Sequence, residues 1–352
     1  MIKRINQNLS TIKLEIYKTT TPERYYPLLH KVLINYDLLR DINKQAHYMK
    51  NIPLGCVMIF EILTGHLKND GFRRKFKKLL GNRQLIDIYE QDIYIRMNMQ
   101  KGTVEDLQDL EYKETEIDNV FKILNIKNST QSIKKYIVTM LKTKVKIQSF
   151  ESCLPVHFLS PEPGSIVIDA TAAPGNKTTQ CADKLNNTGK ILAVEKDKNR
   201  FQILQTMIKD YGCTNVEVVN RDFLDIEPSS ITPDYIIVDP TCSGSGIHVN
   251  YKKNEQRIEK LKNFQFIILN HALKFNAKKI VYSVCSIHPE EGEEVIKEIL
   301  EKNPQYTLQP IAISGKDQGC NDYDFCDKVV RSKKELEKAT GFFVCVLVNT
   351  NR

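Results

Sequence analysis

The chain lacks the long apolar segments that mark membrane and secreted proteins. Nowhere in its 352 residues is there a run of about 18 consecutive apolar side chains, the length that spans a bilayer. The opening segment MIKRINQNLS also has no apolar stretch of the kind found in secretory signals. We therefore expect a soluble intracellular protein that makes no membrane contact.

Cysteine spacings typical of metal sites are absent as well. Nine cysteines occur without a CxxC pair, and Cys320 and Cys326 have the wrong spacing for a zinc knuckle. A disulfide framework is not expected in so large a chain without a secretory signal. We expect free thiols and no metal, so a special role for any cysteine has to be argued from its surroundings.

The chain has only a mild excess of positive charge. The chain has 51 Lys and Arg against 43 Asp and Glu, a formal net charge of +8. That balance suits a polyanionic partner without requiring one. The basic segments 73–78 and 135–142 are candidates for phosphate contacts, although the first can also be a solvated helix face with Phe76 turned inward.

Residues 1–90 contain no catalytic grouping. Apolar residues at helical spacing predict a helical N-terminal domain over residues 1–90, and residues 91–147 are expected to form a small α+β module. The predicted helices cover residues 28–42, 53–63 and 72–79; strands are predicted at 93–98 and 145–147, with helix-like stretches at 103–110 and 114–124.

From residue 148 onward the pattern becomes that of a doubly wound α/β sheet. Short apolar runs alternate with helix-like stretches, which is typical of parallel strands buried on both faces. The runs are residues 166–168, 191–194, 216–219, 235–238, 279–282 and 342–348, and the helix-like stretches are 178–185, 198–211, 255–275 and 291–302. We predict a doubly wound, mostly parallel, Rossmann-like sheet of about seven strands in a domain over residues 148–352.

The loop after the first of these strands lets a ligand lie close to the backbone. The segment DATAAPGNKT, from Asp169 to Thr178, is rich in small residues. Its glycine spacing matches neither the dinucleotide fingerprint nor a Walker loop, so a pyrophosphate or triphosphate cofactor is not favoured. A tight strand-to-helix turn would explain the loop equally well.

Acidic residues follow three successive strands, at the edge where such sheets bind ligands. Asp169 follows the first strand. Glu195 follows the second, where it could accept from both hydroxyls of a ribose, and Asp222 follows the third, where it could accept from an adenine amine. Together they favour a ligand with an adenosine and a cationic amino-acid tail, which describes S-adenosylmethionine, over an anionic phosphate cofactor.

Two cysteines follow the fourth and fifth strands, Cys242 in DPTCSGSG and Cys285 in SVCS. Buried small thiols would be the ordinary explanation for either one. Methylation of cytosine at carbon 5 explains a pair, because that carbon is a poor nucleophile until a thiolate adds at carbon 6. A carboxylic acid at nitrogen 3 would stabilise the adduct, and the carbon 5 proton must leave before the thiol is expelled. The attacking thiol has to be deprotonated first.

The segments DATAAPGNKT, AVEKDKNR, VVNRDF, DYIIVDPTCSGSG and VYSVCSIHPEEGEEV, in this order, resemble the Sun-domain (RsmB-like) RNA cytosine-5 methyltransferases. The resemblance runs from about Gln148 to Leu347. The segments ESCLPVHFLSPEPGS, SGSG and TGFFVCVLV look most like the subfamily that modifies large-subunit ribosomal RNA in eukaryotes. Upstream, IYIRMN resembles a strand of the family's small RNA-binding module, whose Arg96 and Asn98 would brace that module against the catalytic domain.

The resemblance implies a role for each candidate residue. Cys285 would be the nucleophile and Cys242 would assist product release. Asp239 would face nitrogen 3 of the base, and Lys177 would position the base and the acid. The cofactor would be lined by Ala173, Pro174, Gly175, Asn176, Lys177, Glu195, Arg200, Asp222 and Asp239. The resemblance further implies an RNA partner, a monomer, and action in the nucleus and nucleolus.

Two positions depart from the family pattern. Val284 stands where the family has Thr before the nucleophile, and we expect it to tune the site without inactivating it. Thr241 stands where Pro or Ser is commoner. Acidic residues between 290 and 294 are explained by favourable charge at a helix start. Three alternatives stay open: an RNA-binding ribosome-assembly factor with weak or lost catalysis, an enzyme acting on tRNA, and a small-molecule or DNA methyltransferase on the same fold.

Overall fold

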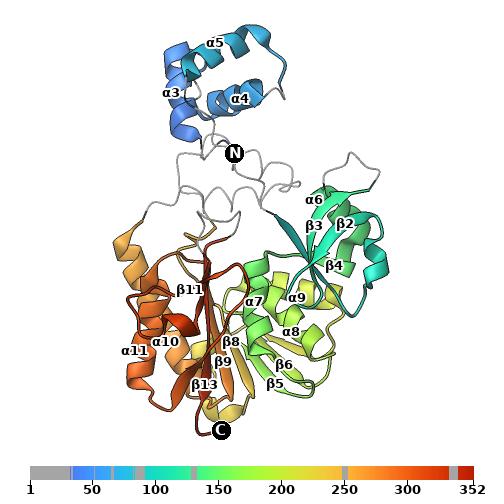
Figure 1. Cartoon of the computed structure of the whole chain (residues 1–352), viewed down its shortest axis with the longest axis vertical. Coiled ribbons are helices and arrows are strands. Elements are labelled where there is room, and N and C mark those ends of the chain that lie inside the picture. Colours follow the sequence, from blue (N-terminus) through green and yellow to red (C-terminus); the bar gives the residue numbers. More distant parts are fainter. Residues whose placement is uncertain are drawn as a thin grey trace. The chain divides into compact units, whose positions relative to one another are not determined.

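The structure is a computed structural model that describes residues 32, 35–50, 52–64, 67–81, 83, 92–127, 133–247, 253–332 and 340–352. The chain divides into two compact units, Met1–Tyr89 and Glu90–Arg352 (Figure 1). Within these described ranges, no helix has both the length and the apolar character needed to cross a membrane.

The described part of the first unit is helical. Its described helices are α3 (Tyr36–Ala46), α4 (Ile52–Thr64) and α5 (Asp70–Leu80). They share an apolar core that includes Leu39, Ile59 and Phe76. The side chain of Asn69 caps α5 by accepting from the N–H of Phe72. Phe76 is fully buried while most basic residues of α5 are exposed, as a solvated helix face requires. Residues 28–31 of the first predicted helix lie outside the described residues.

The second unit begins with a four-stranded antiparallel sheet in the order β2-β3-β1-β4. Its strands are β1 (Ile93–Met97), β2 (Leu110–Glu114), β3 (Val120–Ile126) and β4 (Val145–Ile147), joined by a 3₁₀ helix (Val104–Leu107), α6 (Ile133–Tyr136) and a π-helical turn (Ile137–Leu141). The helix-like interpretation of 114–124 is wrong, because those residues lie at the end of β2, in β3 and in the connection between them, whereas 103–110 contains the 3₁₀ helix Val104–Leu107. In β3, Phe121 and Ile123 point to one core, which is strand periodicity.

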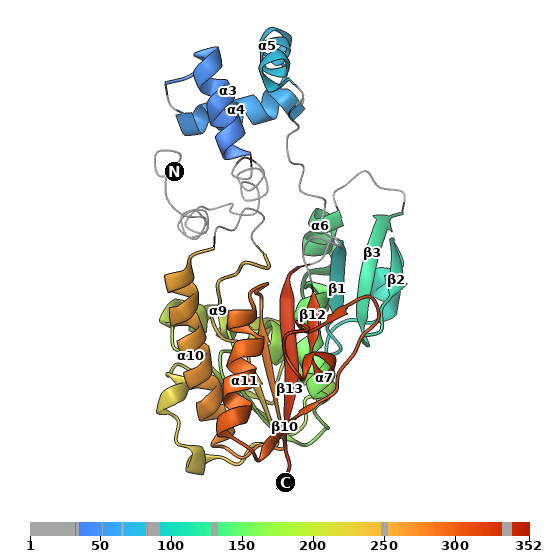
Figure 2. The same cartoon turned by 60° about the vertical axis from the view of Figure 1, so that its left-hand side comes forward.

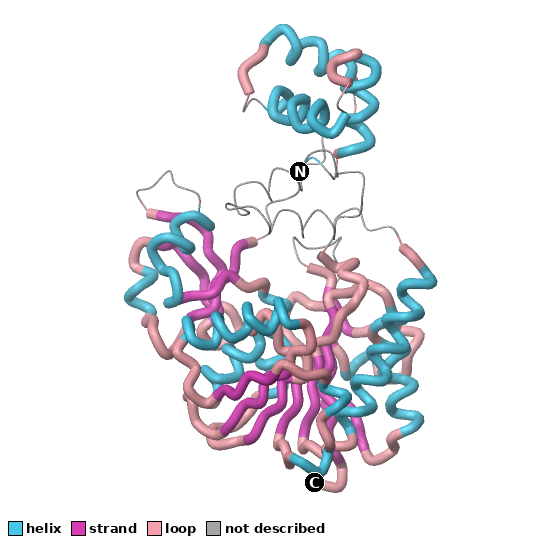
Figure 3. The backbone as a smooth tube through the Cα atoms, turned by 180° about the vertical axis from the view of Figure 1, so that it is seen from behind, coloured by secondary structure: helices cyan, strands magenta, loops and turns pink. Residues whose placement is uncertain are grey.

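A larger mixed sheet follows. Its parallel strands are β5 (Ile166–Asp169), β6 (Lys190–Val194), β7 (Val216–Val219), β8 (Tyr235–Val238) and β9 (Lys279–Val284). They lie in the order β9-β8-β5-β6-β7, so the chain runs outward from β5 to β7 and then crosses to β8. Figure 3 shows these strands side by side. The order reverses beside β5, where sheets of this class bind their ligands.

Antiparallel strands extend this sheet beyond β9. They are β10 (Tyr306–Gln309), β11 (Asp317–Gln318), β12 (Val330–Ser332) and β13 (Phe342–Asn349). Among the described residues the sheet therefore has nine strands, against about seven predicted. Six of the nine coincide with the predicted apolar runs, and β10, β11 and β12 do not; β11 and β12 have only two and three residues, too few for a periodic pattern.

Helices cover both faces of the large sheet. They are α7 (Phe150–Leu159), α8 (Asn176–Lys184), α9 (Lys198–Tyr211), α10 (Glu255–Leu273) and α11 (Glu293–Lys302). Figures 1 and 2 show α10 and α11 on one side of the strands and α7 on the other. Along β8, Ile236 and Val238 join the core beneath α10 and α11, and Tyr235 and Ile237 join the opposite core. Burial on both faces is why the strand is continuously apolar.

Candidate functional site

The sheet brings Lys177, Asp169 and Asp239 together at the point where strand order reverses. Lys177 lies in the first turn of α8, and its Nζ contacts Asp239 Oδ2 at 2.5 Å. Asp239 follows β8, and its Oδ1 accepts from Ser283 Oγ at 2.7 Å. Burial by itself would lower the pKa of Lys177. The neighbouring acidic groups, of which Asp239 has the largest effect, outweigh burial, so the pKa of Lys177 is raised. The ammonium group of Lys177 is thus kept charged beside Asp239.

A second acidic group of the site lies after β6. Glu195 is 6% exposed, and its Oε1 accepts from the backbone N–H of Asp197 at 2.8 Å. Arg200 lies 3.4 Å from Glu195 Oε2 and donates to the carbonyl oxygen of Ala173 at 2.5 Å. Arg200 therefore ties the loop after β5 to the end of β6. These two segments were predicted to line one ligand.

Asp222, after β7, is anchored from two sides. Its Oδ1 accepts from the N–H of Leu224 at 3.1 Å, and its Oδ2 contacts Lys196 Nζ at 2.5 Å. Burial raises the pKa of Asp222, but these hydrogen bonds and the charge of Lys196 outweigh it and the net pKa is lowered. The group is therefore ionised at neutral pH and still has lone pairs for a further donor.

The small residues after β5 let the chain turn sharply into α8. Gly175 has a φ of 110°, in the left-handed region where a side chain is strained. A Cβ there would also lie 3.0 Å from Leu204 Cδ1 and 3.1 Å from Met207 Sδ, both on α9. Pro174 joins Ala173 through a cis peptide bond, and Asn176 is the first residue of α8. The glycine is thus required by the turn and by packing against α9.

The two candidate cysteines lie in adjoining loops. The first cysteine loop (residues 239–247) follows β8 and carries Cys242, and the second cysteine loop (residues 285–292) follows β9 and carries Cys285. Backbone N–H groups of Gly244 and Cys285 donate to the Cys242 sulfur. The N–H of Gly246 in turn donates to the carbonyl oxygen of Cys285 at 3.1 Å. Both thiols are partly exposed, at the same edge of the sheet as Asp239.

Neither thiol is ionised in the free protein. Burial raises the pKa of Cys242 to about 12, with the charge of nearby Glu291 adding to the shift. Burial, Cys242 and Asp239 also raise the pKa of Cys285, against which Lys177 acts in the opposite direction. A reaction that needs a thiolate here must therefore remove a proton as it proceeds, because the resting charge distribution does not do so.

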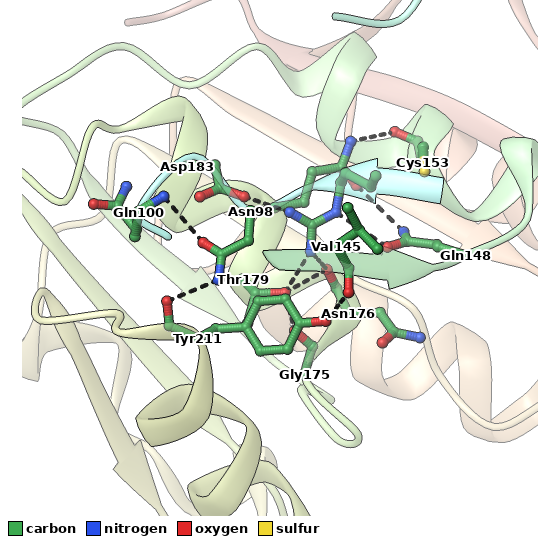
Figure 4. Close-up of polar contacts among 12 residues, drawn as sticks. Asn98, Gln100, Val145, Gln148, Cys153, Gly175, Asn176, Thr179, Asp183 and Tyr211 are labelled. Carbon is green, nitrogen blue, oxygen red and sulfur yellow. Dashed lines mark hydrogen bonds and ion pairs between the residues drawn. The ribbon is translucent and has the colours of Figure 1, made fainter. Parts of the chain in front are cut away.

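Arg96 joins the four-stranded sheet to the large sheet. The residue is 2% exposed, pairs with Asp183 of α8, and donates to Thr179 Oγ1 at 2.6 Å and Gln148 Oε1 at 3.2 Å. These three partners surround the guanidinium group of Arg96. Figure 4 shows Thr179, Gln148 and Asp183 close together, with Asn98 beside them. Asn98 Nδ2 donates to the carbonyl oxygen of Tyr211 at 3.1 Å, at the end of α9. Both residues thus bridge the two parts of this unit.

Removing the Arg96 side chain should destabilise this unit strongly. We expect Arg96→Ala to lower the free energy of unfolding by about 3 kcal/mol or more, because Asp183 would be left as an uncompensated buried charge. Urea unfolding followed by circular dichroism measures the change. Lys190→Ala, which breaks a 2.7 Å ion pair with Glu217 whose side chains are each about half exposed, should cost less than about 1 kcal/mol. Equal losses in the two variants would contradict the bridging role.

The raised pKa of Asp169 predicts an unusual pH dependence of the free energy of unfolding. Burial raises its pKa to about 6, despite the hydrogen bond that Thr178 Oγ1 donates at 2.7 Å. The unfolded group ionises near pH 4, so between about pH 4 and 6 the folded state binds the extra proton and this group's stabilising contribution falls as pH rises. Asp169→Asn should therefore raise the unfolding free energy by about 1–2 kcal/mol at pH 7.5 and change it little at pH 4.

Urea unfolding at the two pH values checks this expectation. Asp118→Asn is the control: the Asp118 side chain is 73% exposed and its pKa is lowered by Lys184, so the variant should gain no stability at pH 7.5. An Asp169→Asn protein less stable than the parent at pH 7.5 would show that the carboxylate is a net stabilising group.

The model of the family described as 16S rRNA methyltransferase RsmB/F matches residues 156–348, more than half of the chain. The chain belongs to this family. The RsmB/F match covers β5 to β9, both cysteine loops and most of β13, and so includes every candidate catalytic residue.

Individual relatives agree with the RsmB/F assignment. The 28S rRNA (cytosine-C(5))-methyltransferase of Mus musculus is 37% identical over 212 residues, covering 57% of this chain and 46% of that protein. The tRNA (cytosine(72)-C(5))-methyltransferase of Pyrococcus horikoshii is 30% identical over 204 residues, covering 57% and 51%. The chain spans about half the length of the curated relatives it matches.

Solved structures agree in fold. The crystal structure of NSun6 from Pyrococcus horikoshii with SFG superposes with a TM-score of 0.64 at 20% identity, covering 74% of this chain and 91% of that one. At this identity the likeness establishes the α/β methyltransferase fold, which confirms the predicted fold class.

Sequence reasoning missed the buried partners around the two cysteine loops. Glu291 and Glu293 are both 0% exposed, although helix-start charge had explained them. Glu293 pairs with buried Arg331 of β12, and Glu291 accepts hydrogen bonds from both cysteine loops. Their spacing alone gives no signal of burial. The only hint is the crowding of acids next to a cysteine motif. Among the described residues no cluster of three or more His, Cys, Asp and Glu side chains could hold a metal ion.

Proposed function

We propose that this protein is an S-adenosylmethionine-dependent RNA methyltransferase that forms 5-methylcytosine, with large-subunit ribosomal RNA as its substrate. The observation that carries the proposal is the meeting of Cys242 and Cys285 in adjoining loops beside Asp239 and Lys177. Membership of the RsmB/F family and the 37% identity to a 28S rRNA cytosine-C5 methyltransferase support the chemistry and the RNA class.

The cofactor proposal rests on the donor set of the site. Carboxylates of Asp169, Glu195 and Asp222 lie after three neighbouring parallel strands, beside a loop whose small side chains leave room near the backbone. This arrangement fits a cationic, adenosine-bearing molecule and fits a phosphate-bearing one poorly. Glu195 would bind the ribose, Asp222 the adenine amine, and the loop from Ala173 to Asn176 would lie against the cofactor. When bound, S-adenosylmethionine supplies an electrophilic methyl group.

In the proposed reaction Cys285 is the nucleophile. Its thiol loses a proton and its sulfur bonds to carbon 6 of the cytosine, which makes carbon 5 an enamine carbon able to take the methyl group. The proton released by Cys285 would pass to the Asp239 carboxylate, which Lys177 and Ser283 hold, and Asp239 would then donate it to nitrogen 3 as the adduct forms. Loss of the carbon 5 proton to solvent then restores the double bond and expels the Cys285 sulfur, a step that Cys242 assists. The expelled thiolate recovers its proton from nitrogen 3 through Asp239.

Basic segments would supply contacts to the RNA backbone. Extruding a cytosine from a paired stem costs a few kcal/mol, and phosphate contacts can offset that cost. The exposed lysines and arginines of α5, and the exposed Lys135 and Lys142 of segment 135–142, are available for such contacts. We expect the protein to act as a monomer in the nucleolus; its mass in solution and its location in cells test these two expectations.

One experiment tests the proposal. Purified protein is incubated with radiolabelled S-adenosylmethionine and deproteinised large-subunit rRNA, small-subunit rRNA or tRNA, and the RNA is digested to nucleosides. We expect label in 5-methylcytidine from large-subunit rRNA. Label in 5-methylcytidine only from tRNA would correct the substrate class, and label in methyladenosine would overturn the chemistry. Absence of cofactor binding would favour an RNA-binding assembly factor.

A further inference from the structure

Glu291 links the two cysteine loops through a buried carboxylate. Its Oε1 accepts from the backbone N–H of Ser243 in the first cysteine loop at 2.8 Å, and its Oε2 accepts from Ser286 Oγ in the second at 2.6 Å. Ser243 follows Cys242 directly and Ser286 follows Cys285 directly. All three side chains are 2% exposed or less. One carboxylate thus holds the neighbours of both thiols.

The first cysteine loop is held from α10 as well. Gln265, fully buried on α10, donates from Nε2 to Glu291 Oε1 at 3.0 Å and to the carbonyl oxygen of Thr241 at 3.1 Å. Both residues that flank Cys242 are therefore fixed by one connected group, the Thr241 carbonyl through Gln265 and the Ser243 N–H through Glu291.

A hydroxyl chain completes the connection between the loops. Ser245 Oγ lies 3.0 Å from Ser243 Oγ and 3.1 Å from Ser286 Oγ. It also accepts from the N–H of Ile287 at 3.0 Å. The chain is buried, so none of these groups can exchange its partner for water without opening the loops. Breaking the network would free both thiols together.

We propose that Glu291 is a positioning residue, whose buried carboxylate fixes the two cysteine loops relative to one another and so sets both thiols on one substrate ring. The catalytic consequence rests on the function proposed above, whereas the structural consequence does not. A carboxylate suits this task because it accepts from several donors and donates to none, which matches the N–H, amide and hydroxyl groups that face it. Its charge also adds to the forces that raise the pKa of Cys242.

The test compares Glu291→Ala with Glu291→Gln. We expect Glu291→Ala to lower kcat about a hundredfold, the scale of a misplaced catalytic group, with KM for cofactor and RNA changed less than about threefold. Glu291→Gln should keep at least about a tenth of kcat, because its amide can accept from Ser243 and donate to the Ser286 hydroxyl. Glu290→Ala, which breaks only a 2.5 Å pair with the half-exposed Lys253, is the matched control and should retain parental kcat.

Alkylation separates positioning from folding and needs no RNA. With limiting iodoacetamide and peptide mass spectrometry, Cys242 and Cys285 of Glu291→Ala should react at least about fivefold faster than in the parent. Cys345, buried at 0% exposure in β13, should stay unmodified and so report an intact fold. A parental alkylation rate at both thiols in folded Glu291→Ala protein would overturn the proposal. So would a loss of kcat in Glu291→Gln equal to that in Glu291→Ala.

The two proposals fail in distinguishable ways. If the parent protein transfers no methyl group to any RNA while the alkylation difference holds, the loop-positioning role stands and the function is wrong. If Glu291→Ala does not fold, seen as modification of Cys345, the milder Ser286→Ala variant is used. That variant removes the 2.6 Å bond to Glu291 Oε2 and should accelerate alkylation of the two loop thiols in the same way; unchanged rates there overturn the proposal.

Discussion

Replacing Cys285 by alanine should abolish methyl transfer. The sulfur supplies the bond to carbon 6 without which carbon 5 of cytosine stays unreactive, so we expect kcat to fall by at least about 10³-fold. Incorporation of radiolabelled methyl groups into rRNA measures the loss. Cofactor affinity should change less than about threefold, because Glu195 and Asp222 lie after other strands, and equilibrium binding of S-adenosylmethionine measures it.

The matched control for this variant is Cys326→Ala. Cys326 is also a partly exposed free thiol, but it lies in a 3₁₀ helix (Cys326–Lys328) outside both cysteine loops. We expect it to keep parental activity. Turnover by Cys285→Ala within tenfold of the parent would show that the assigned nucleophile is wrong. If both Cys285→Ala and Cys326→Ala kept the parental turnover, neither thiol would take part in the reaction.

Replacing Cys242 by alanine should give the opposite phenotype, a protein arrested on its RNA. If Cys242 assists the last step, attack by Cys285 and methylation proceed and the adduct persists. We expect a band of slower mobility on a denaturing gel that holds most of the protein, against a trace for the parent. Multiple turnover should fall by at least about a hundredfold, while a single methyl group per protein is still transferred.

The trapped band has a strict internal control. A Cys242→Ala, Cys285→Ala double variant should give none, because the bond that is trapped is the Cys285 sulfur–carbon bond. A slow band in the double variant would assign the covalent link to another residue. Absence of a band in Cys242→Ala alone, in protein that still binds RNA, would remove the release role from Cys242.

Much of the site was predictable from the sequence because parallel strands carry their own signal. Each buried strand is a short apolar run, and its carboxyl end is where the first polar residue appears, which located Asp169, Glu195 and Asp239 at a common edge. The resemblance to a known family then implied roles for individual residues, which the positions of the strand ends alone could not. The structure adds that Lys177 contacts Asp239 and that the two cysteine loops adjoin.

What the sequence did not reveal depends on partners distant in the chain. No strand was predicted at β2, and residues 114–124 were interpreted as helix-like although Val120–Ile126 form β3, whose identity comes from pairing with β1 and β2. Glu291 looked like a helix-start charge, yet its partners Ser243 and Gln265 lie 48 and 26 residues earlier. Nor does any local pattern indicate that both thiols are protonated at rest, since burial raises the pKa of each.

The central claim is that Cys285 forms a covalent bond to a cytosine while the neighbouring Cys242 waits to release it. The most direct measurement is mass spectrometry of the slow band formed by Cys242→Ala, after protease and nuclease digestion. We predict a peptide carrying a methylated cytidine on Cys285. A nucleotide attached to any other residue, or an unmethylated one after incubation with excess S-adenosylmethionine, would contradict the account.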